Sequence, residues 1–288
     1  EQLEKQPFLF PEDMKRFKEL ERIKLIIPTK YISYKSSTFL DSIRSAIFEF
    51  FKKERSGETF IESLKWLLFQ DYGPGQLQDQ DLLASCPHCP DCGGEIYLTD
   101  VFRLHEAVDE EFGASGILGY LTTLIEQIII IHHVKYILKK RPKLLSEILF
   151  IKDGPLAFFG QTANMHKPMR KLCNFLQKRH QFYLVGLEKS GAFVDHADVI
   201  CSSIINNGNP LLPKGNALLL SNEYIYTYIM PGIPNDDKPY ASTSYYGSKL
   251  IYHTSEGGVY VATLPVKDKK VVLAPTKDKF KHLNLILS

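Results

Sequence analysis

The stretch Glu147-Ile-Leu-Phe-Ile-Lys-Asp153-Gly154-Pro155 decides the fold class of this 288-residue chain. Its apolar run is continuous and ends in Asp-Gly, which is typical of a buried strand that delivers a carboxylate at its C-terminal end. A helix is expected over residues 166–178, and a second apolar run follows over 182–189. A strand, a helix and a strand at this spacing predict a parallel βαβ unit with a right-handed crossover.

The remaining elements extend this unit on both sides. Helical spacing of apolar residues predicts helices over 37–53 and 59–71, and a long helix that starts near Gly116 and ends near Lys140. Short strands are expected over 95–102, 217–220, 249–252 and 259–263, separated by glycines and prolines. The predicted fold class is therefore α/β, with one mixed sheet flanked by helices.

Composition narrows the class of protein. Hydrophobic residues make up 44% of the chain and charged residues 24%, which excludes a wholly disordered or fibrous protein. The net charge of +2 neither requires nor excludes a nucleic-acid partner. The most apolar stretch, Ile117–Leu138, contains charged side chains that would be costly in lipid, so we expect a buried core helix, no membrane association and a cytoplasmic protein.

Three charged residues are candidates for chemistry. Asp153 ends a buried strand where ligand sites of α/β sheets gather, although an Asp-Gly turn that merely closes the strand is an equal alternative. Glu126 interrupts an apolar helix; it either faces solvent or shares a divalent cation with Asp153. Lys189 ends the neighbouring strand and is suited to contact a phosphate, the alternative being a surface ion pair with Glu188.

His132 and His133 are consecutive, so they face different directions and are expected to pack or to lie on the surface.

The segment Cys86-Pro-His-Cys89-Pro-Asp-Cys92-Gly-Gly indicates a metal site. The Cys-x-x-Cys-Gly spacing forms a knuckle that directs thiolates at Zn²⁺, so Cys86, Cys89 and Cys92 are predicted ligands of a structural zinc. A fourth ligand is not evident, because Cys173 and Cys201 are distant in sequence and His88 is too close to its neighbours. An odd cysteine count with one tight cluster indicates a reducing compartment rather than a disulfide framework.

The end of the long helix is basic. Lys139, Lys140 and Arg141 follow one another there, and we consider them as contacts to a DNA backbone. Compensation of the helix dipole on a solvated surface is the alternative.

Two stretches, the first of which overlaps the one quoted above, resemble a known family. Phe150-Ile-Lys-Asp-Gly-Pro-Leu-Ala-Phe-Phe-Gly-Gln161 and Tyr183-Leu-Val-Gly-Leu-Glu-Lys-Ser-Gly191 resemble the NurA nuclease family. The segments 96–106 and 219–226 look like a bacterial branch that carries a cysteine insertion, and the resemblance runs from about Phe8 to the end of the chain.

The resemblance implies an RNase H-like fold and a manganese-dependent DNA nuclease, with exonuclease and single-strand endonuclease activity. It further implies a homodimer seated on a hexameric HerA-type ATPase, in the processing of DNA ends or in phage defence. By this resemblance Asp153 matches the second family aspartate and Lys189 a strand-end lysine. Glu126 is the preferred match for the helix glutamate, and the alternatives are Glu106, Glu110 and Glu111. Mn²⁺ or Mg²⁺ would be held by Asp153 and Glu126.

One domain in three parts is expected: a helical part over 1–80, a zinc knuckle over 81–100 and an RNase H-like core over 101–288. The chain lacks the family's Asp-Gly-Ser strand and its C-terminal tyrosine and histidine, and Tyr245 and Tyr246 are weak substitutes. We therefore expect that the sequence is part of a longer chain. The alternatives to an active nuclease are an inactive NurA-like scaffold of a translocase and a zinc-ribbon DNA-binding module.

Overall fold

The computed structural model describes Ile47 and residues 50–73, 101–107, 115–204, 208–267 and 270. These residues belong to two compact units. The first unit draws on the chain up to Tyr136 and on Phe159–Met165, and the second on Ile137–Phe158 and the chain from His166 onward.

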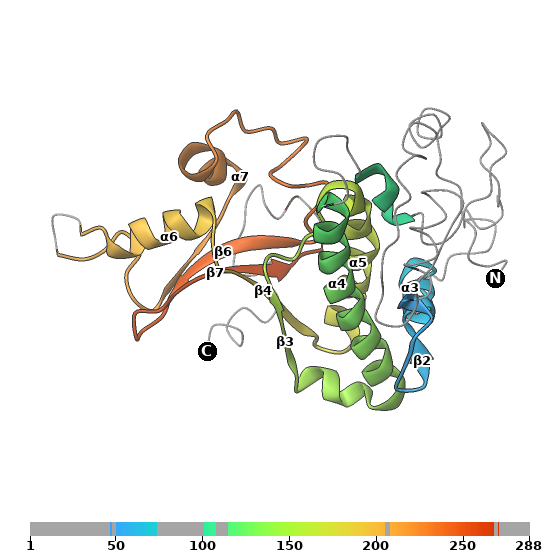
Figure 1. Ribbon diagram of the computed structural model, residues 1–288. Coiled ribbons are helices and arrows are strands. Elements are labelled where there is room, and N and C mark those ends of the chain that lie inside the picture. Colours follow the sequence, from blue (N-terminus) through green and yellow to red (C-terminus); the bar gives the residue numbers. More distant parts are fainter. Residues whose placement is uncertain are drawn as a thin grey trace. The chain divides into compact units, whose positions relative to one another are not determined.

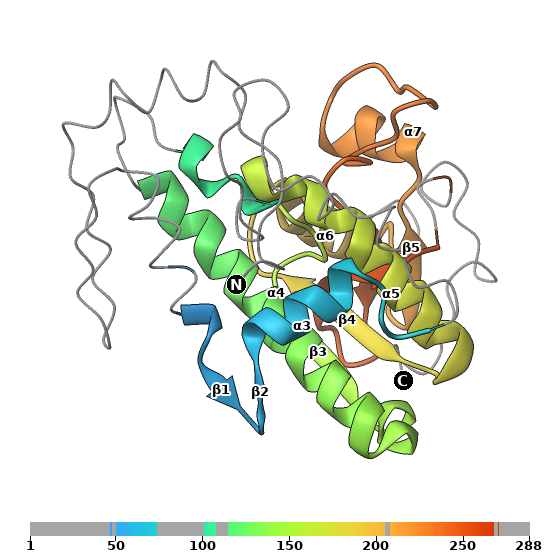
Figure 2. The same ribbon diagram turned by 90° about the vertical axis from the view of Figure 1, so that its right-hand side faces the viewer.

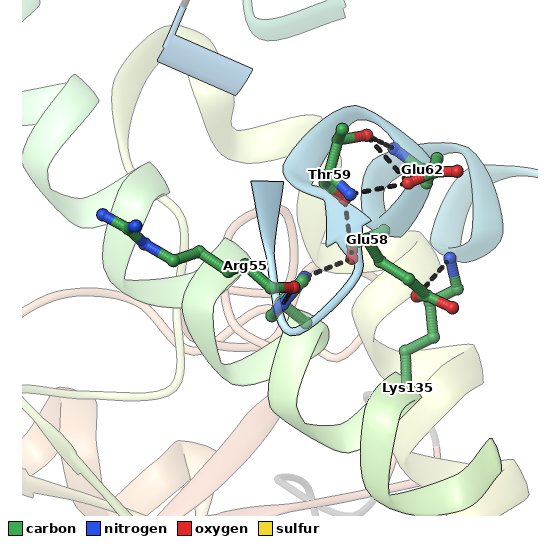
Figure 3. Close-up of polar contacts among 7 residues, drawn as sticks. Arg55, Glu58, Thr59, Glu62 and Lys135 are labelled. Carbon is green, nitrogen blue, oxygen red and sulfur yellow. Dashed lines mark hydrogen bonds and ion pairs between the residues drawn. The ribbon is translucent and has the colours of Figure 1, made fainter. Parts of the chain in front are cut away.

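The first unit contains a small hairpin that leads into a helix. Strands β1 (Glu54–Arg55) and β2 (Glu58–Thr59) pair antiparallel, and α3 (Phe60–Leu68) follows directly (Figure 2). A reciprocal capping box starts the helix: the Glu62 backbone N–H donates to Thr59 Oγ1 at 3.2 Å, and the Thr59 N–H donates to Glu62 Oε2 at 2.6 Å (Figure 3). The helix predicted over 59–71 is therefore confirmed, with its end at Leu68.

The long helix α4 (Ser115–Lys140) also agrees with the sequence prediction. Its buried positions, Leu124, Ile128, Ile131 and Val134, recur at helical spacing. Lys135 forms an ion pair with Glu58 of β2 at 2.9 Å, which ties the helix to the hairpin (Figure 3). Among the described residues, the helical segment Ile117–Lys140 is long enough and apolar enough to cross a membrane, judged by length and composition alone. The expectation that the protein does not associate with a membrane therefore stays a prediction.

The two neighbouring histidines of α4 have different environments, as predicted. His133 is exposed, whereas His132 is buried and packs edge-on against Phe60 with ring centroids 5.1 Å apart. His132 Nε2 lies 3.0 Å from the Arg55 carbonyl oxygen, and Nδ1 lies 2.9 Å from Ser63 Oγ. A carbonyl only accepts, so Nε2 carries the proton. In the neutral ring Nδ1 then accepts from the Ser63 hydroxyl, which also lies 3.3 Å from the Thr59 carbonyl oxygen.

Acidification is expected to destabilise the first unit through His132. Burial lowers the pKa of His132, so the folded unit keeps the ring neutral while the unfolded chain takes up a proton below about pH 6.5. Stability is thus full above that pH and is lost as pH falls toward the folded-state pKa, at up to about 1.4 kcal/mol per pH unit. Urea unfolding between about pH 8 and pH 5 measures this slope. His132→Gln, which does not titrate, should have a shallower slope than the wild type; an equal slope would contradict the assignment.

The prediction of a strand over 95–102 is wrong for Val101 and Phe102, the two of its residues that the structure describes. Val101 and Phe102, the end of the strand predicted over 95–102, lie in a 3₁₀ turn, just before η5 (Leu104–Ala107). Phe102 is fully buried and packs on Phe51 at 5.6 Å between ring centroids. The apolar residues at this end of the segment fill a core instead of continuing a sheet. The same unit also holds η7 (Gly160–Met165), which contacts η5.

The second unit is built on a five-stranded mixed sheet in the order β3-β4-β7-β6-β5 (Figure 1). Strands β3 (Leu149–Asp153) and β4 (Tyr183–Glu188) are parallel and are joined through α5 (His166–Arg179). Antiparallel strands β7 (Val259–Pro265), β6 (Gly247–His253) and β5 (Asn216–Leu219) complete the sheet. The predicted α/β class, the parallel βαβ unit and the three later strands are confirmed. The expectation that the first strand is buried is wrong: β3 is an edge strand of the sheet, and Leu149 and Ile151 are exposed. The short helix η6 (Pro142–Ser146) leads from α4 into β3. The short helix α7 (Asn222–Tyr224) and the π-helical turn η8 (Ile225–Ile229) lie between β5 and β6.

Helix α6 (Ala192–Ser202), which the sequence analysis did not predict, covers one face of this sheet. Phe193, Ala197 and Ile200 of α6 form one core cluster with Ile251 of β6 and Val261 of β7. A second cluster joins side chains of β4, β6 and β7 with the residue that follows β7: Val185, Leu250, Ala262, Leu264 and Val266. The two clusters use alternate residues of the same strands, so both faces of the central sheet carry apolar side chains.

Candidate functional site

Asp153 and Lys189 meet at one edge of the sheet. The positions of both residues follow from the parallel pairing of β3 and β4, because parallel strands place their C-terminal ends at the same edge of the sheet. Lys189 Nζ donates to Asp153 Oδ2 at 2.7 Å, and the two side chains are 63% (Asp153) and 75% (Lys189) exposed. The hydrogen bond from Lys189 is the main cause that lowers the pKa of Asp153. The alternative, a Lys189–Glu188 surface pair, is replaced by this contact.

The loop after Asp153 is held firmly from two sides. Gly154 adopts a φ of +81°, which favours glycine, and its N–H donates to the Leu187 carbonyl at 2.6 Å. Further along the loop, the Phe158 N–H donates to the Ser244 carbonyl at 3.0 Å, and the Tyr246 N–H donates to the Leu156 carbonyl at 3.0 Å. The Asp-Gly turn of the alternative interpretation therefore exists, and it fixes the backbone under an exposed carboxylate.

A buried ion pair lies beside this edge, on the opposite side of β4 from Lys189. Glu188 accepts a hydrogen bond from Lys249 of β6, with side chains that are 11% and 2% exposed. The Lys249 ammonium also lies over the rings of Phe193 and Tyr245, at 4.1 and 4.9 Å from their centroids. Burial lowers the pKa of Lys249 and raises the pKa of Tyr245. This pair was not predicted, because its only signal in the sequence is one charged residue in each of two apolar strands.

Glu126 is exposed on α4 and belongs to the first compact unit, whereas Asp153 belongs to the second. A cation shared by Glu126 and Asp153 therefore stays a prediction. Of the alternatives, Glu106 lies in η5, and Glu110 and Glu111 lie outside the described residues. Tyr245 and Tyr246 are buried in the second unit, where Tyr245 packs on Lys249.

A metal site would need several His, Cys, Asp or Glu side chains to come together in the part of the chain that the structure describes. Within that part of the chain, no group of three or more His, Cys, Asp and Glu side chains could hold a metal ion. Asp153 by itself has the right chemistry, since it is an exposed carboxylate and carboxylate oxygens are preferred by Mg²⁺ and Mn²⁺. The predicted zinc ligands Cys86, Cys89 and Cys92 lie outside the described residues.

The two remaining cysteines do not extend the zinc set. Cys173 and Cys201 are buried free thiols, and burial raises the pKa of both, that of Cys173 to about 12. A buried thiol with a raised pKa is unreactive, which favours a packing role for each.

The predicted DNA contacts form an exposed turn. Lys139, Lys140 and Arg141 are all exposed where α4 ends. The chain then passes through η6 and enters β3 at Leu149 (Figure 1). A strand rises about 3.3 Å per residue, so Asp153 lies roughly 13 Å beyond Leu149. The basic turn and Asp153 thus lie at opposite ends of β3, and the turn is not part of the Asp153–Lys189 contact.

Comparison of the chain with protein-family models, with curated proteins and with solved structures gave no significant match. The resemblance to NurA nucleases therefore stays a prediction, and the residues at the sheet edge are what the structure offers as evidence of function.

Proposed function

We propose that this protein is a divalent-metal-dependent DNA nuclease with an RNase H-like core, of the NurA type. The observation that carries the proposal is the exposed Asp153 carboxylate at the C-terminal end of a parallel strand, 2.7 Å from the Lys189 ammonium. An acid and a cation in contact at such an edge match what phosphoryl transfer requires: a ligand for a divalent cation and a positive charge for phosphate oxygens.

The roles of the residues follow from their positions. Mn²⁺ or Mg²⁺ would supply Lewis-acid stabilisation of phosphate charge and activation of water. Asp153 would hold that cation, supported by the clamped Gly154 loop, and Glu126 is the proposed second ligand. Lys189 would contact a non-bridging phosphate oxygen, and its long flexible stem suits that contact. Lys139, Lys140 and Arg141 would bind the DNA backbone before it reaches the edge.

Three further parts of the proposal concern assembly. We propose a structural zinc on Cys86, Cys89 and Cys92, a homodimer, and a HerA-type hexameric ATPase as partner. The role would be in DNA-end repair or in phage defence, in the cytoplasm.

The test is cleavage of linear duplex and single-stranded DNA by the full-length protein, with and without Mn²⁺ and the ATPase. Asp153→Asn should lower the cleavage rate at least about 100-fold, because metal stabilisation of transition-state charge is worth several kcal/mol. It should leave the unfolding midpoint unchanged, since the side chain is exposed.

Asp198→Asn is the matched control. It neutralises another exposed carboxylate of the same unit, on α6, and should cut like the wild type. Full cleavage by Asp153→Asn would contradict the assignment of the site. A folded wild type that cuts neither substrate under any condition would favour the inactive scaffold.

A further inference from the structure

The Lys189 ammonium lies where a cation bound to Asp153 would lie. It donates to Asp153 Oδ2 at 2.7 Å, and ammonium and metal ions seek the same lone pairs of a carboxylate. Resting on the proposed function, we infer that Lys189 is a built-in competitor of the divalent cation at Asp153. It neutralises the carboxylate in the metal-free protein and is released when the cation binds.

The backbone around the pair explains why Lys189 points at Asp153. Glu188 is held on the α6 side of the sheet by the buried Lys249, whose ammonium lies over the Phe193 ring. Successive side chains of an extended chain point to opposite faces, so anchoring Glu188 directs Lys189 to the other face. That face is the one of Leu187, which pairs in register with Asp153. The neighbouring Gly154 N–H also donates to the Leu187 carbonyl, so the two strand ends keep their spacing.

The side chains themselves are not held in this way. The Lys189 side chain is 75% exposed, and its ammonium sits at the end of a flexible four-carbon stem. The ammonium can therefore leave Asp153 without disturbing the fold. Exposed ion pairs are weak and screened by salt. Competition of this kind therefore weakens metal binding by a modest factor and does not block it.

Release of Lys189 has a consequence for substrate binding. A DNA phosphate that attracts the ammonium removes the competitor from Asp153, and a cation at Asp153 frees the ammonium for phosphate. Binding of metal and of DNA should therefore favour each other, by the same factor in both directions.

Mn²⁺ titration of the full-length protein by calorimetry, without DNA, tests the inference. Lys189→Met should tighten Mn²⁺ binding roughly two- to five-fold, and added KCl should reduce the difference. Lys189→Arg keeps the competing cation and should not tighten binding. Lys171→Met, which removes an exposed charge from α5, should behave as the wild type. Asp153→Asn should abolish this binding event.

The outcomes separate this inference from the proposed function. Loss of binding in Asp153→Asn, together with unchanged or weaker binding in Lys189→Met, would keep the metal site and overturn the competition. Wild-type binding in Asp153→Asn would overturn both. An unchanged urea midpoint for Lys189→Met excludes misfolding as the cause of either result.

Discussion

Gly186→Ala is expected to destabilise the second unit by about 2 kcal/mol or more, because the added methyl group has no space. A Cβ at this position would lie 2.6 Å from the Gly154 carbonyl oxygen and 2.9 Å from the Leu156 nitrogen. Both atoms are backbone, so they cannot swing away as a flexible side chain would. The loop that follows Asp153 would have to move, or β4 would have to shift within the sheet.

Urea unfolding followed by circular dichroism measures this effect, and Gly119→Ala is the control. Gly119 is an exposed position of helix α4, where an added Cβ meets no atom within 4 Å. The same substitution should stabilise that helix by about 0.5–1 kcal/mol, because alanine is the better helix former. The two substitutions should therefore have opposite signs. A Gly186→Ala protein as stable as the wild type would show that the loop does not cross β4 as closely as described.

Gly186→Ala also affects the proposed site. The displaced loop includes Gly154, whose N–H donates to the Leu187 carbonyl beside Asp153. Cleavage by a folded Gly186→Ala protein should therefore fall further than its stability alone explains.

Local sequence patterns predicted much of the second unit. The apolar runs that form β3 and β4 are continuous, and the segment between them has helical spacing, so the parallel unit could be read from a short window. The contact between Asp153 and Lys189 follows from this unit, since both residues end its parallel strands. The placement needed no knowledge of the rest of the sheet.

Other features needed information from outside any local window. Helix α6 follows Gly191 without a side-chain cap, so the usual N-terminal signal is missing. Val101 and Phe102 have a strand-like composition, yet Phe102 fills the core of the first unit. At Phe102 tertiary packing overrides the local preference, whereas α6 had no start signal to indicate it.

The partner of Glu188 was not predictable for a different reason. Glu188 and Lys249 lie 61 residues apart, and they face each other only because β7 lies between β4 and β6. Gly186, Thr263 and Lys249 share one register row, and Glu188 lies in the next row of the same face. Sheet order and register both had to be known before this pair could be assigned.

Lys249→Met is expected to destabilise the second unit by about 3–5 kcal/mol, because it leaves the Glu188 carboxylate buried without its partner. Glu188→Leu should cost less. Without Glu188, the Lys249 side chain would still lie over the rings of Phe193 and Tyr245, which stabilise its charge. Because burial already lowers the pKa of Lys249, the ammonium could also lose its proton instead of staying buried as an unpaired charge.

The double variant Glu188→Leu/Lys249→Met decides what the pair does. Apolar side chains of similar size often replace a buried ion pair without loss of stability, so the double variant should regain most of the wild-type urea midpoint. If the pair also aims Lys189, this stable protein should still differ from the wild type in Mn²⁺ affinity, because nothing would then hold residue 188 to the α6 side. If the double variant lost as much stability as the two single variants together, the two residues would not be coupled. A double variant with wild-type stability and wild-type Mn²⁺ affinity would limit the pair to packing.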